Sequence, residues 1–303
     1  MGFLSKWLAH WPNLERWKRS ALSLTLFLML ITGIYAFNIE PNWYDVQQVT
    51  LTLPHLPVAF DRYRIVQLTD IHVDNRMNPA RLQRITELVN QQQPNLIVLT
   101  GDYVTRRAER YLPNLSLGLQ QLQAPDGILA VLGTHDYWHN PQQVTKTLQS
   151  IGVQVLANQL VTIQRSEAQL QIAGLDDLSF RKADLKPILA QMGTAQGAIL
   201  LAHEPDSANM NAATGKFDLQ LSGHAHGGQI NLLGLHFFPR LGRLYPVGQY
   251  QVRQMIQYTS RGVGAVPPRG RLNCRPEITV LTLRSPWAQS QISPPTKNLY
   301  TLP

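Results

Sequence analysis

Cysteine is nearly absent from this chain of 303 residues, and charged residues are scarce. Cys274 is the single cysteine, which excludes an intramolecular disulfide and any zinc site built from several thiolates. Charged residues make up 15% of the sequence and hydrophobic residues 44%, which is too apolar for a disordered chain. The length is sufficient to bury a sizeable core, so a small stapled module is also excluded.

Acidic residues are fewer than basic ones, and the formal net charge is +8. A positive balance favours anionic partners such as phosphorylated substrates, acidic lipid surfaces or nucleic acid, and it equally fits a soluble basic surface. The first twenty residues hold four basic side chains and one Glu, which accounts for +3 of the total. Because the remaining charge is too dispersed to define a groove, we expect no nucleic-acid partner.

An uncharged run long enough to cross a bilayer lies at residues 21–39. At about 1.5 Å per residue it matches a hydrocarbon core of about 30 Å. Residues 1–20 before it are basic and carry Trp7, Trp11 and Trp17, as expected of an interfacial segment. We therefore predict a single-pass anchor in the cell membrane, with everything after Glu40 outside the cytoplasm by the positive-inside rule. A cleaved signal peptide is the alternative, but the run exceeds the usual length and no small-residue cleavage site follows it.

Prolines and polar residues delimit one expected globular domain at residues 59–284. Residues 40–58 contain Pro41, Pro54 and Pro57 and indicate a linker, while residues 285–303 form a tail rich in Ser, Pro and Gln. Between them, short apolar runs predict buried strands at 63–68, 95–100, 128–132, 170–175, 198–202, 218–222 and 277–283. Helical patterns after Pro79 and Pro141 alternate with these runs, which predicts an α/β layered fold.

Polar clusters follow five of these seven predicted strands. In an open α/β sheet, ligands collect beyond the carboxyl ends of the strands, so clusters distant in sequence can converge. Carboxylate and imidazole donors without thiolate suit Mn²⁺, Fe or Zn²⁺, and an aspartate between two cations can bridge them. Each cluster alone also fits a turn or a helix cap, whereas the five together predict a metal site. The clusters contain Asp70 and His72, Asp102, Thr134 with His135 and Asp136, His203, and His224 with His226.

In their order and their positions after strands, these clusters resemble the signature of the calcineurin-like metallophosphoesterase superfamily. The stretches HAHGGQINLLG (224–234), SRGVG (260–264) and LNCRPEITVLTL (272–283) resemble its membrane-anchored bacterial phosphodiesterase branch. The resemblance implies a four-layer αββα sandwich of two mixed sheets, here with an N-terminal transmembrane helix. It also implies a metal-dependent phosphoric ester hydrolase with two divalent ions, Mn, Fe or Zn, at the strand ends.

The resemblance further implies a role for each matching residue. One metal would be held by Asp70, His72, Asp102 and His226, and the other by Asp102, His203, His224 and Thr134. A hydroxide bridging the two metals would attack phosphorus, His135 would protonate the leaving oxygen, and Asp136 would orient the His135 imidazole. Gly227 and Gly228 would let the backbone approach the substrate, or simply form a turn. Arg261, Asn273 and Arg275 would contact the phosphate or headgroup, or be solvated.

Thr134 departs from the family pattern, which has Asn at this position. Because a threonine hydroxyl is a poor neutral ligand and lies nearer the backbone, we expect weaker binding of the second metal. The expected substrate is a phosphodiester or pyrophosphate, lipid-linked or nucleotide-linked, such as a UDP-diacylated sugar, although that compound requires a cytoplasmic domain and conflicts with the predicted topology. The alternative is a weakly active or non-catalytic metal- or ligand-binding protein. Metal identity, ester preference and oligomeric state do not follow from the sequence.

Overall fold

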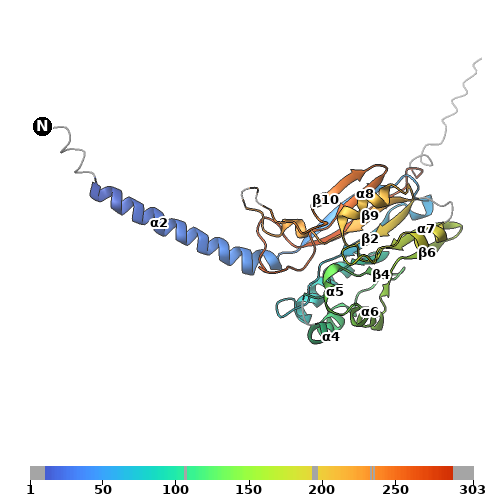
Figure 1. Cartoon of the computed structure of the whole chain (residues 1–303), viewed down its shortest axis with the longest axis horizontal. Coiled ribbons are helices and arrows are strands. Elements are labelled where there is room, and N and C mark those ends of the chain that lie inside the picture. Colours follow the sequence, from blue (N-terminus) through green and yellow to red (C-terminus); the bar gives the residue numbers. More distant parts are fainter. Residues whose placement is uncertain (1–10, 106–107, 193–196, 233, 235, 289–303) are drawn as a thin grey trace, which may run out of the picture.

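A long helix stands apart from a two-sheet domain (Figure 1) in the computed structural model, which describes residues 11–105, 108–192, 197–232, 234 and 236–288. Helix α2 (Trp11–Ile34) continues into a π-helical turn, η1 (Tyr35–Ile39), and a 3-10 turn, η2 (Glu40–Asn42). The large apolar side chains of α2, such as Leu22, Leu26 and Leu30, are more than half exposed. The segment Arg16–Asn42 is long and apolar enough to cross a membrane, by length and composition.

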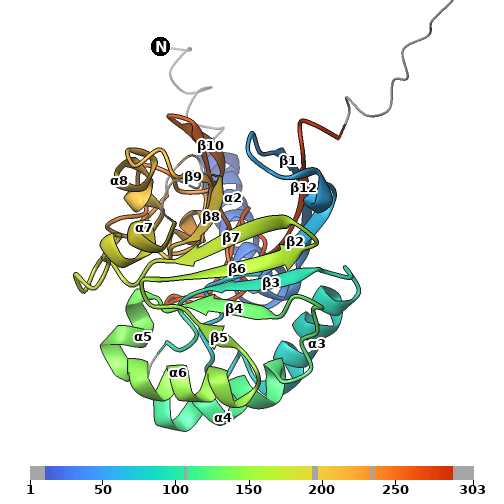
Figure 2. The same ribbon diagram turned by 90° about the vertical axis from the view of Figure 1, so that its right-hand side faces the viewer.

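Two mixed six-stranded sheets form the domain (Figure 2). In the first sheet the β12–β2 pair is antiparallel and the other pairs are parallel; in the second, the two edge pairs β10–β11 and β7–β6 are antiparallel. The first sheet has the order β1 (Asp45–Thr52), β12 (Glu277–Arg284), β2 (Tyr63–Leu68), β3 (Leu96–Thr100), β4 (Ile128–Val131) and β5 (Gln154–Val155). The second has the order β10 (Gly248–Val252), β11 (Met255–Thr259), β9 (Phe217–Ser222), β8 (Ala198–Leu201), β7 (Ala168–Gly174) and β6 (Gln159–Arg165).

Apolar side chains on both faces of each sheet produce four layers. Ile65 and Val98 of the first sheet share one buried cluster with Ile172 and Leu221 of the second, so this cluster lies between the sheets. The outer face of the first sheet packs against α3 (Pro79–Asn90), α4 (Ala108–Leu119) and α6 (Pro141–Ser150), and that of the second against α7 (Lys186–Met192) and α8 (Ala208–Ala212). The seven predicted strands and the predicted αββα sandwich are confirmed.

The expected linker at residues 40–58 was wrong, because it contains strand β1. This strand pairs in parallel with β12 from Asp45 opposite Glu277 to Thr52 opposite Arg284. Leu51 is its one fully buried residue, so a half-exposed edge strand gave no continuous apolar signal. The edge strands β6 and β10 were missed for the same reason. Of the predicted tail, residues 289–303 lie outside the described part of the chain.

Candidate metal centre

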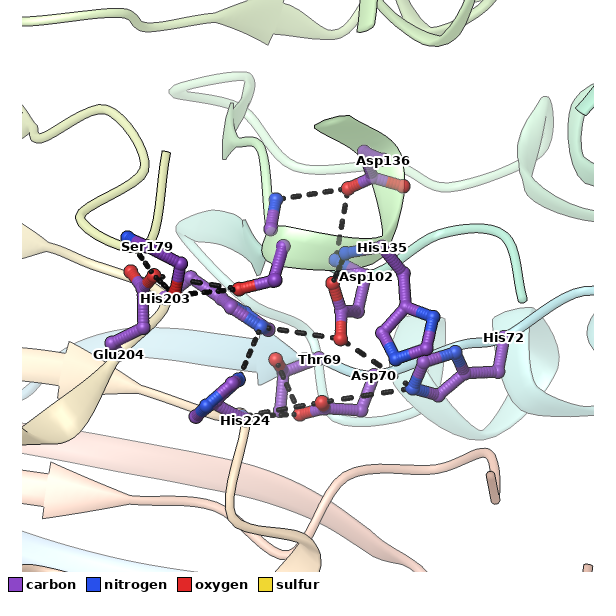
Figure 3. Close-up of polar contacts among 12 residues, drawn as sticks. Thr69, Asp70, His72, Asp102, His135, Asp136, Ser179, His203, Glu204 and His224 are labelled. Carbon is purple, nitrogen blue, oxygen red and sulfur yellow. Dashed lines mark hydrogen bonds and ion pairs between the residues drawn. The ribbon is translucent and has the colours of Figure 1, made fainter. Parts of the chain in front are cut away.

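The polar clusters after the strands meet where the carboxyl ends of both sheets come together (Figure 3). Asp70 and His72 follow β2, Asp102 follows β3, His203 follows β8, and His224 and His226 follow β9. All but His203 have a positive φ, between 51° and 68°. Side-chain-bearing residues adopt this conformation at a cost, and its concentration here is typical of functional sites. The backbone therefore turns sharply at each strand exit and directs these side chains to one place.

Three groups of metal-ligating atoms form there, each within 4.8 Å, and the third, His72, Asp102 and His135, shares residues with the other two. In the first, His226 Nε2 lies 3.1 Å from His72 Nε2 and 3.3 Å from Asp70 Oδ1. In the second, His203 Nε2 lies 3.2 Å from both His224 Nδ1 and Asp102 Oδ2. Asp102 Oδ2 is also 3.6 Å from His72 Nε2, so this carboxylate lies between the groups. The six predicted Asp and His ligands are all buried.

The protonation of these imidazoles suits a metal site. Burial lowers the pKa of His72 to about 3, and burial together with His72 lowers the pKa of His226 well below its ordinary value. Both rings are therefore neutral at physiological pH, and neither Nδ1 has a hydrogen-bond partner among the described residues. Two neutral rings with Nε2 atoms 3.1 Å apart can both be satisfied by donating lone pairs to cations. The donor set of nitrogen and carboxylate oxygen fits divalent ions.

Asp102 and His203 each shift the pKa of the other toward its charged form. Burial raises the pKa of Asp102, but the positive charge of His203 outweighs it and holds this pKa well below its ordinary value. Burial likewise lowers the pKa of His203, and the negative charges of Asp102 and Asp70 reverse the effect and raise it. The His203 Nδ1 atom is 2.7 Å from the Thr100 carbonyl, which directs Nε2 toward Asp102. An ionised carboxylate is thus fixed at the centre of the site.

His135 lies at the start of α5 (Thr134–His139), beside the first donor group. Its backbone N–H donates to Asp102 Oδ1 at 2.8 Å, and its ring packs edge-on against His72 and Trp138. Its Nδ1 has no hydrogen-bond partner among the residues that the structure describes. The ring is therefore placed by packing and by its backbone, next to the cavity described below.

The expected contact between Asp136 and the His135 imidazole was wrong. The Asp136 carboxylate is fully buried and accepts hydrogen bonds from the backbone N–H groups of Gly133, Asp102, Tyr103 and Val104. Burial and the negative charge of Asp102 raise the pKa of Asp136 to about 8. Asp136 therefore joins the exits of β3 and β4 to α5, and it positions Asp102 rather than His135.

The Thr134 hydroxyl is turned toward a carboxylate cluster that the sequence analysis did not assign to the site. It lies 3.1 Å from Asp177 Oδ2, 3.3 Å from Ser179 Oγ and 3.4 Å from Glu204 Oε1. Glu204 also accepts hydrogen bonds from the backbone and hydroxyl of Ser179. The position of Glu204 directly after His203 was the available signal. A hydroxyl committed to these partners is poorly placed to serve as a metal ligand.

A cavity of about 690 Å³ adjoins both donor groups. Its walls include Asp102, Thr134, His135, His224 and His226, and beyond these they are mostly apolar. The apolar lining residues include Trp138, Ile230, Leu232, Phe237, Phe238, Val266 and Pro267. The candidate metal centre is thus open to a space that suits a partly apolar molecule.

Four of the predicted substrate contacts are not among the cavity-lining residues. Arg261 pairs with Glu277 and Asp45, and Arg275 with Asp45 and the ring of Trp43. The Asn273 amide donates to the carbonyl of Asn231. Gly228 lines the cavity, whereas the place of a side chain on Gly227 is taken by Arg261 and Cys274. The structure gives these arginines partners within the protein rather than in the cavity.

Arg271, which no sequence pattern identified, is fully buried. Its guanidinium donates to the carbonyls of Arg261, Gly262, Gly264 and Cys274. The same loop reaches the metal ligands, since the backbone N–H of Gly264 donates to the Asp70 carbonyl at 2.8 Å. Arg271 therefore fixes the loop that supports Asp70.

Comparison with known proteins agrees with this geometry. Residues 63–228 match the family model of the calcineurin-like phosphoesterases. The chain is 34% identical over 257 residues to the uncharacterized metallophosphoesterase YkuE of Bacillus subtilis, covering 83% of this chain and 89% of that protein. It is 32% identical to phosphodiesterase YaeI of Escherichia coli, covering 82% and 92% of the two chains.

A third relative carries the word transmembrane in its name. The transmembrane protein with metallophosphoesterase domain of Danio rerio is 28% identical over 276 residues, which cover 86% of this chain and 62% of that protein. The family match includes strands of both sheets and every strand exit that supplies a candidate ligand atom. This chain belongs to the calcineurin-like phosphoesterase family and is a metal-dependent phosphoester hydrolase.

Proposed function

We propose that this protein is a membrane-anchored phosphoesterase with two metal ions that hydrolyses a phosphodiester or a pyrophosphate. The observation that carries the proposal is the position of Asp102 between two donor groups that border one cavity. Asp70, His72, Asp102 and His226 would hold one divalent ion, and Asp102, His203 and His224 the other. Thr134 supports the second group less than Asn would, because its hydroxyl is engaged by Asp177 and Glu204.

In such a site, two divalent cations supply activation of the attacking water and stabilisation of charge on the phosphoryl oxygens. The reaction breaks the phosphorus–oxygen bond of the leaving group and forms one to the oxygen of water. One proton of that water ends on the leaving oxygen. His135 borders the cavity, and its imidazole can carry this proton.

The cavity walls favour a substrate with an apolar part next to its phosphate. Trp138, Phe237 and Phe238 offer rings and Leu232 an aliphatic side chain beside the ligands. A lipid-linked or nucleotide-linked phosphoester fits this chemistry, and a UDP-diacylated sugar is one example. The helix α2 would keep the enzyme at the membrane where amphiphilic substrates reside.

Topology distinguishes among these substrates. The basic residues before α2 favour a cytoplasmic N-terminus and a domain outside the cytoplasm. A UDP-linked substrate requires the opposite orientation. Alkaline phosphatase and green fluorescent protein fused in turn to the C-terminus report the side: phosphatase activity supports the predicted orientation, and fluorescence without phosphatase activity contradicts it.

The function is tested with the purified full-length protein in detergent. We expect hydrolysis of bis(p-nitrophenyl) phosphate that EDTA abolishes and Mn²⁺ restores, together with elemental analysis that approaches two metal ions per chain. The monoester p-nitrophenyl phosphate measures the ester preference. Metal binding without hydrolysis of either ester would favour the non-catalytic alternative, and an absence of bound metal would contradict the proposal.

His135→Gln tests the proton donor, and His139→Gln is its matched control on the same helix. The His139 ring is hydrogen-bonded to the Thr105 carbonyl and is not among the cavity-lining residues. We expect His135→Gln to lower kcat about 10²- to 10⁴-fold with metal content unchanged. An equal loss in both variants would refute the role of His135.

A further inference from the structure

The end of the candidate membrane helix is docked onto the loop that continues into one wall of the cavity. The backbone N–H of Arg271 donates to the Ala36 carbonyl at 2.8 Å, and the ring of Phe37 lies directly against Gly270. The buried carboxylate of Glu40 accepts backbone N–H groups of Asn273 and Cys274. These contacts fix the domain relative to the helix.

Ala36 and Phe37 belong to the uncharged run 21–39, which sets the level of the bilayer surface. Trp43 lies four residues after the end of this run and is half exposed. The Arg76 side chain donates a hydrogen bond to the Phe37 carbonyl at 3.3 Å. Tryptophan and basic side chains at the end of an apolar helix mark the headgroup region. The boundary between hydrocarbon and headgroups therefore lies near residue 40, and Gly270 lies at that boundary.

One wall of the cavity ends two residues before Gly270 in the chain. Val266, Pro267 and Pro268 line the cavity and lead directly to Gly270. The Gln229 amide donates to the carbonyls of Val266 and Pro268, which ties this wall to the segment after β9. Figure 1 shows the loops after β9 at the end of the domain that faces α2. The mouth of the cavity thus lies beside the bilayer surface.

Large apolar side chains project from the same mouth. Phe237 is 90% exposed and Leu232 is 48% exposed, although both line the cavity. Exposed aromatic and aliphatic side chains of this size, clustered at a binding site, are typical of surfaces that contact another apolar phase. We name Leu232, Phe237, Phe238 and Pro267 the apolar rim.

We propose that the apolar rim inserts into the bilayer that α2 enters, so that the cavity opens directly to lipid. The hydrocarbon chain of an amphiphilic phosphoester then passes from the membrane between rim residues, while its phosphate reaches the ligands around Asp102. The partner is the lipid bilayer, and the substrate class is a membrane-resident phosphoester. This inference rests on the membrane anchor of the proposed function.

A probe on the rim tests the insertion independently of activity. Phe237→Cys is labelled with the environment-sensitive dye NBD in the full-length protein, in nanodiscs of phosphatidylcholine and phosphatidylglycerol. The native Cys274 is buried, and the unsubstituted protein controls for its labelling. Thr162→Cys is the matched control, because it is exposed on β6 at the end of the domain away from α2 (Figure 1).

We expect blue-shifted emission at position 237, quenched by nitroxides on the lipid chains, and water-like emission at position 162. Water-like, unquenched emission at both positions would overturn the inference. This readout requires no catalysis, so it remains decisive if the proposed hydrolysis is not observed.

A pair of substrates tests the consequence for catalysis. Hexadecyl p-nitrophenyl phosphate embedded in the nanodiscs is compared with soluble bis(p-nitrophenyl) phosphate, since both release the same group. We expect Leu232→Ser and Phe237→Ser to lower the ratio of the lipid rate to the soluble rate about tenfold. Leu117→Ser on α4, a half-exposed residue outside the cavity, should leave the ratio unchanged.

An unchanged ratio in the rim variants would refute the lipid route while leaving the phosphoesterase intact. If the unsubstituted protein hydrolyses neither ester, the proposed function fails and the probe alone decides the membrane contact. The two failures are therefore distinguishable.

Discussion

Gly262→Ala tests whether the loop after β11 holds the first metal ligand in place. Gly262 has a φ of +70°, and a Cβ there would lie 2.7 Å from Asp70 Cβ and 3.1 Å from the Thr69 carbonyl oxygen. A non-glycine residue in this conformation costs about 1 to 2 kcal/mol. Forcing the additional contact in a packed interior costs about 1 to 3 kcal/mol more. The two costs give an expected loss of about 2 to 5 kcal/mol in the free energy of unfolding.

Gly215→Ala separates the two costs. Gly215 has a similar φ of +64°, but an added Cβ would meet no atom within 4 Å. It therefore carries the conformational cost alone, about 1 to 2 kcal/mol. For a domain of this size, each kcal/mol lowers Tm by about 2 to 4 °C.

The assay combines thermal unfolding with a Mn²⁺ titration of both variants. We expect the fall in Tm of Gly262→Ala to be at least roughly twice that of Gly215→Ala. We also expect Gly262→Ala to bind Mn²⁺ at least about tenfold more weakly, because Asp70 is displaced. Equal Tm losses with unchanged Mn²⁺ affinity would show that the loop does not position Asp70.

Three further predictions concern the second metal, the buried arginine and pH. Thr134→Asn should supply an amide ligand, and we expect it to raise the metal content and to raise turnover about tenfold. Elemental analysis measures the metal content and kinetics the turnover; an increase in neither would contradict a weakened second site. Arg271→Lys should lower the free energy of unfolding by at least about 2 kcal/mol, since a lysine leaves several buried carbonyls unpaired at about 1 to 3 kcal/mol each. Urea unfolding measures this loss, and a loss below about 1 kcal/mol would argue against the role of the guanidinium. The backbone N–H of Ser285 and the Arg284 side chain hold the pKa of Asp61 below its ordinary value, so its stabilisation is present above the unfolded pKa of about 3.9 and is lost as pH falls through the folded value. Asp61→Asn should therefore cost more stability near pH 7 than near pH 3, and an equal cost at both would refute this linkage.

Local sequence patterns were sufficient to find most of the buried strands, although not β11, and the candidate ligands that follow them. Each predicted strand is a short segment rich in apolar residues, and each candidate ligand lies within a few residues of the end of one, so the signal does not depend on distant parts of the chain. The edge strands β1 and β6 were not predicted, because their residues are half exposed and form no apolar run. Strand β1 is recognisable only by its pairing with β12, more than 200 residues later in the chain.

Side-chain directions were the other part that sequence left undecided. Asp136 follows His135 in the chain, yet it turns to the backbone N–H groups of Asp102 and Tyr103. Arg261 was expected to contact a phosphate or to be solvated, and it pairs instead with Glu277. In both cases the side chain takes a partner that is near in space, which the spacing along the chain does not reveal.

The sequence by itself located the candidate ligands, because each Asp or His follows a strand that a local apolar pattern predicts. The tertiary structure alone decided how the parts meet. It placed Asp102 between the ligand groups, turned the Thr134 hydroxyl toward Glu204, and brought Phe37 of η1, just after α2, against Gly270 beside the cavity. These relations join residues far apart in the chain, and packing and hydrogen bonding across the two sheets determine them rather than any local preference.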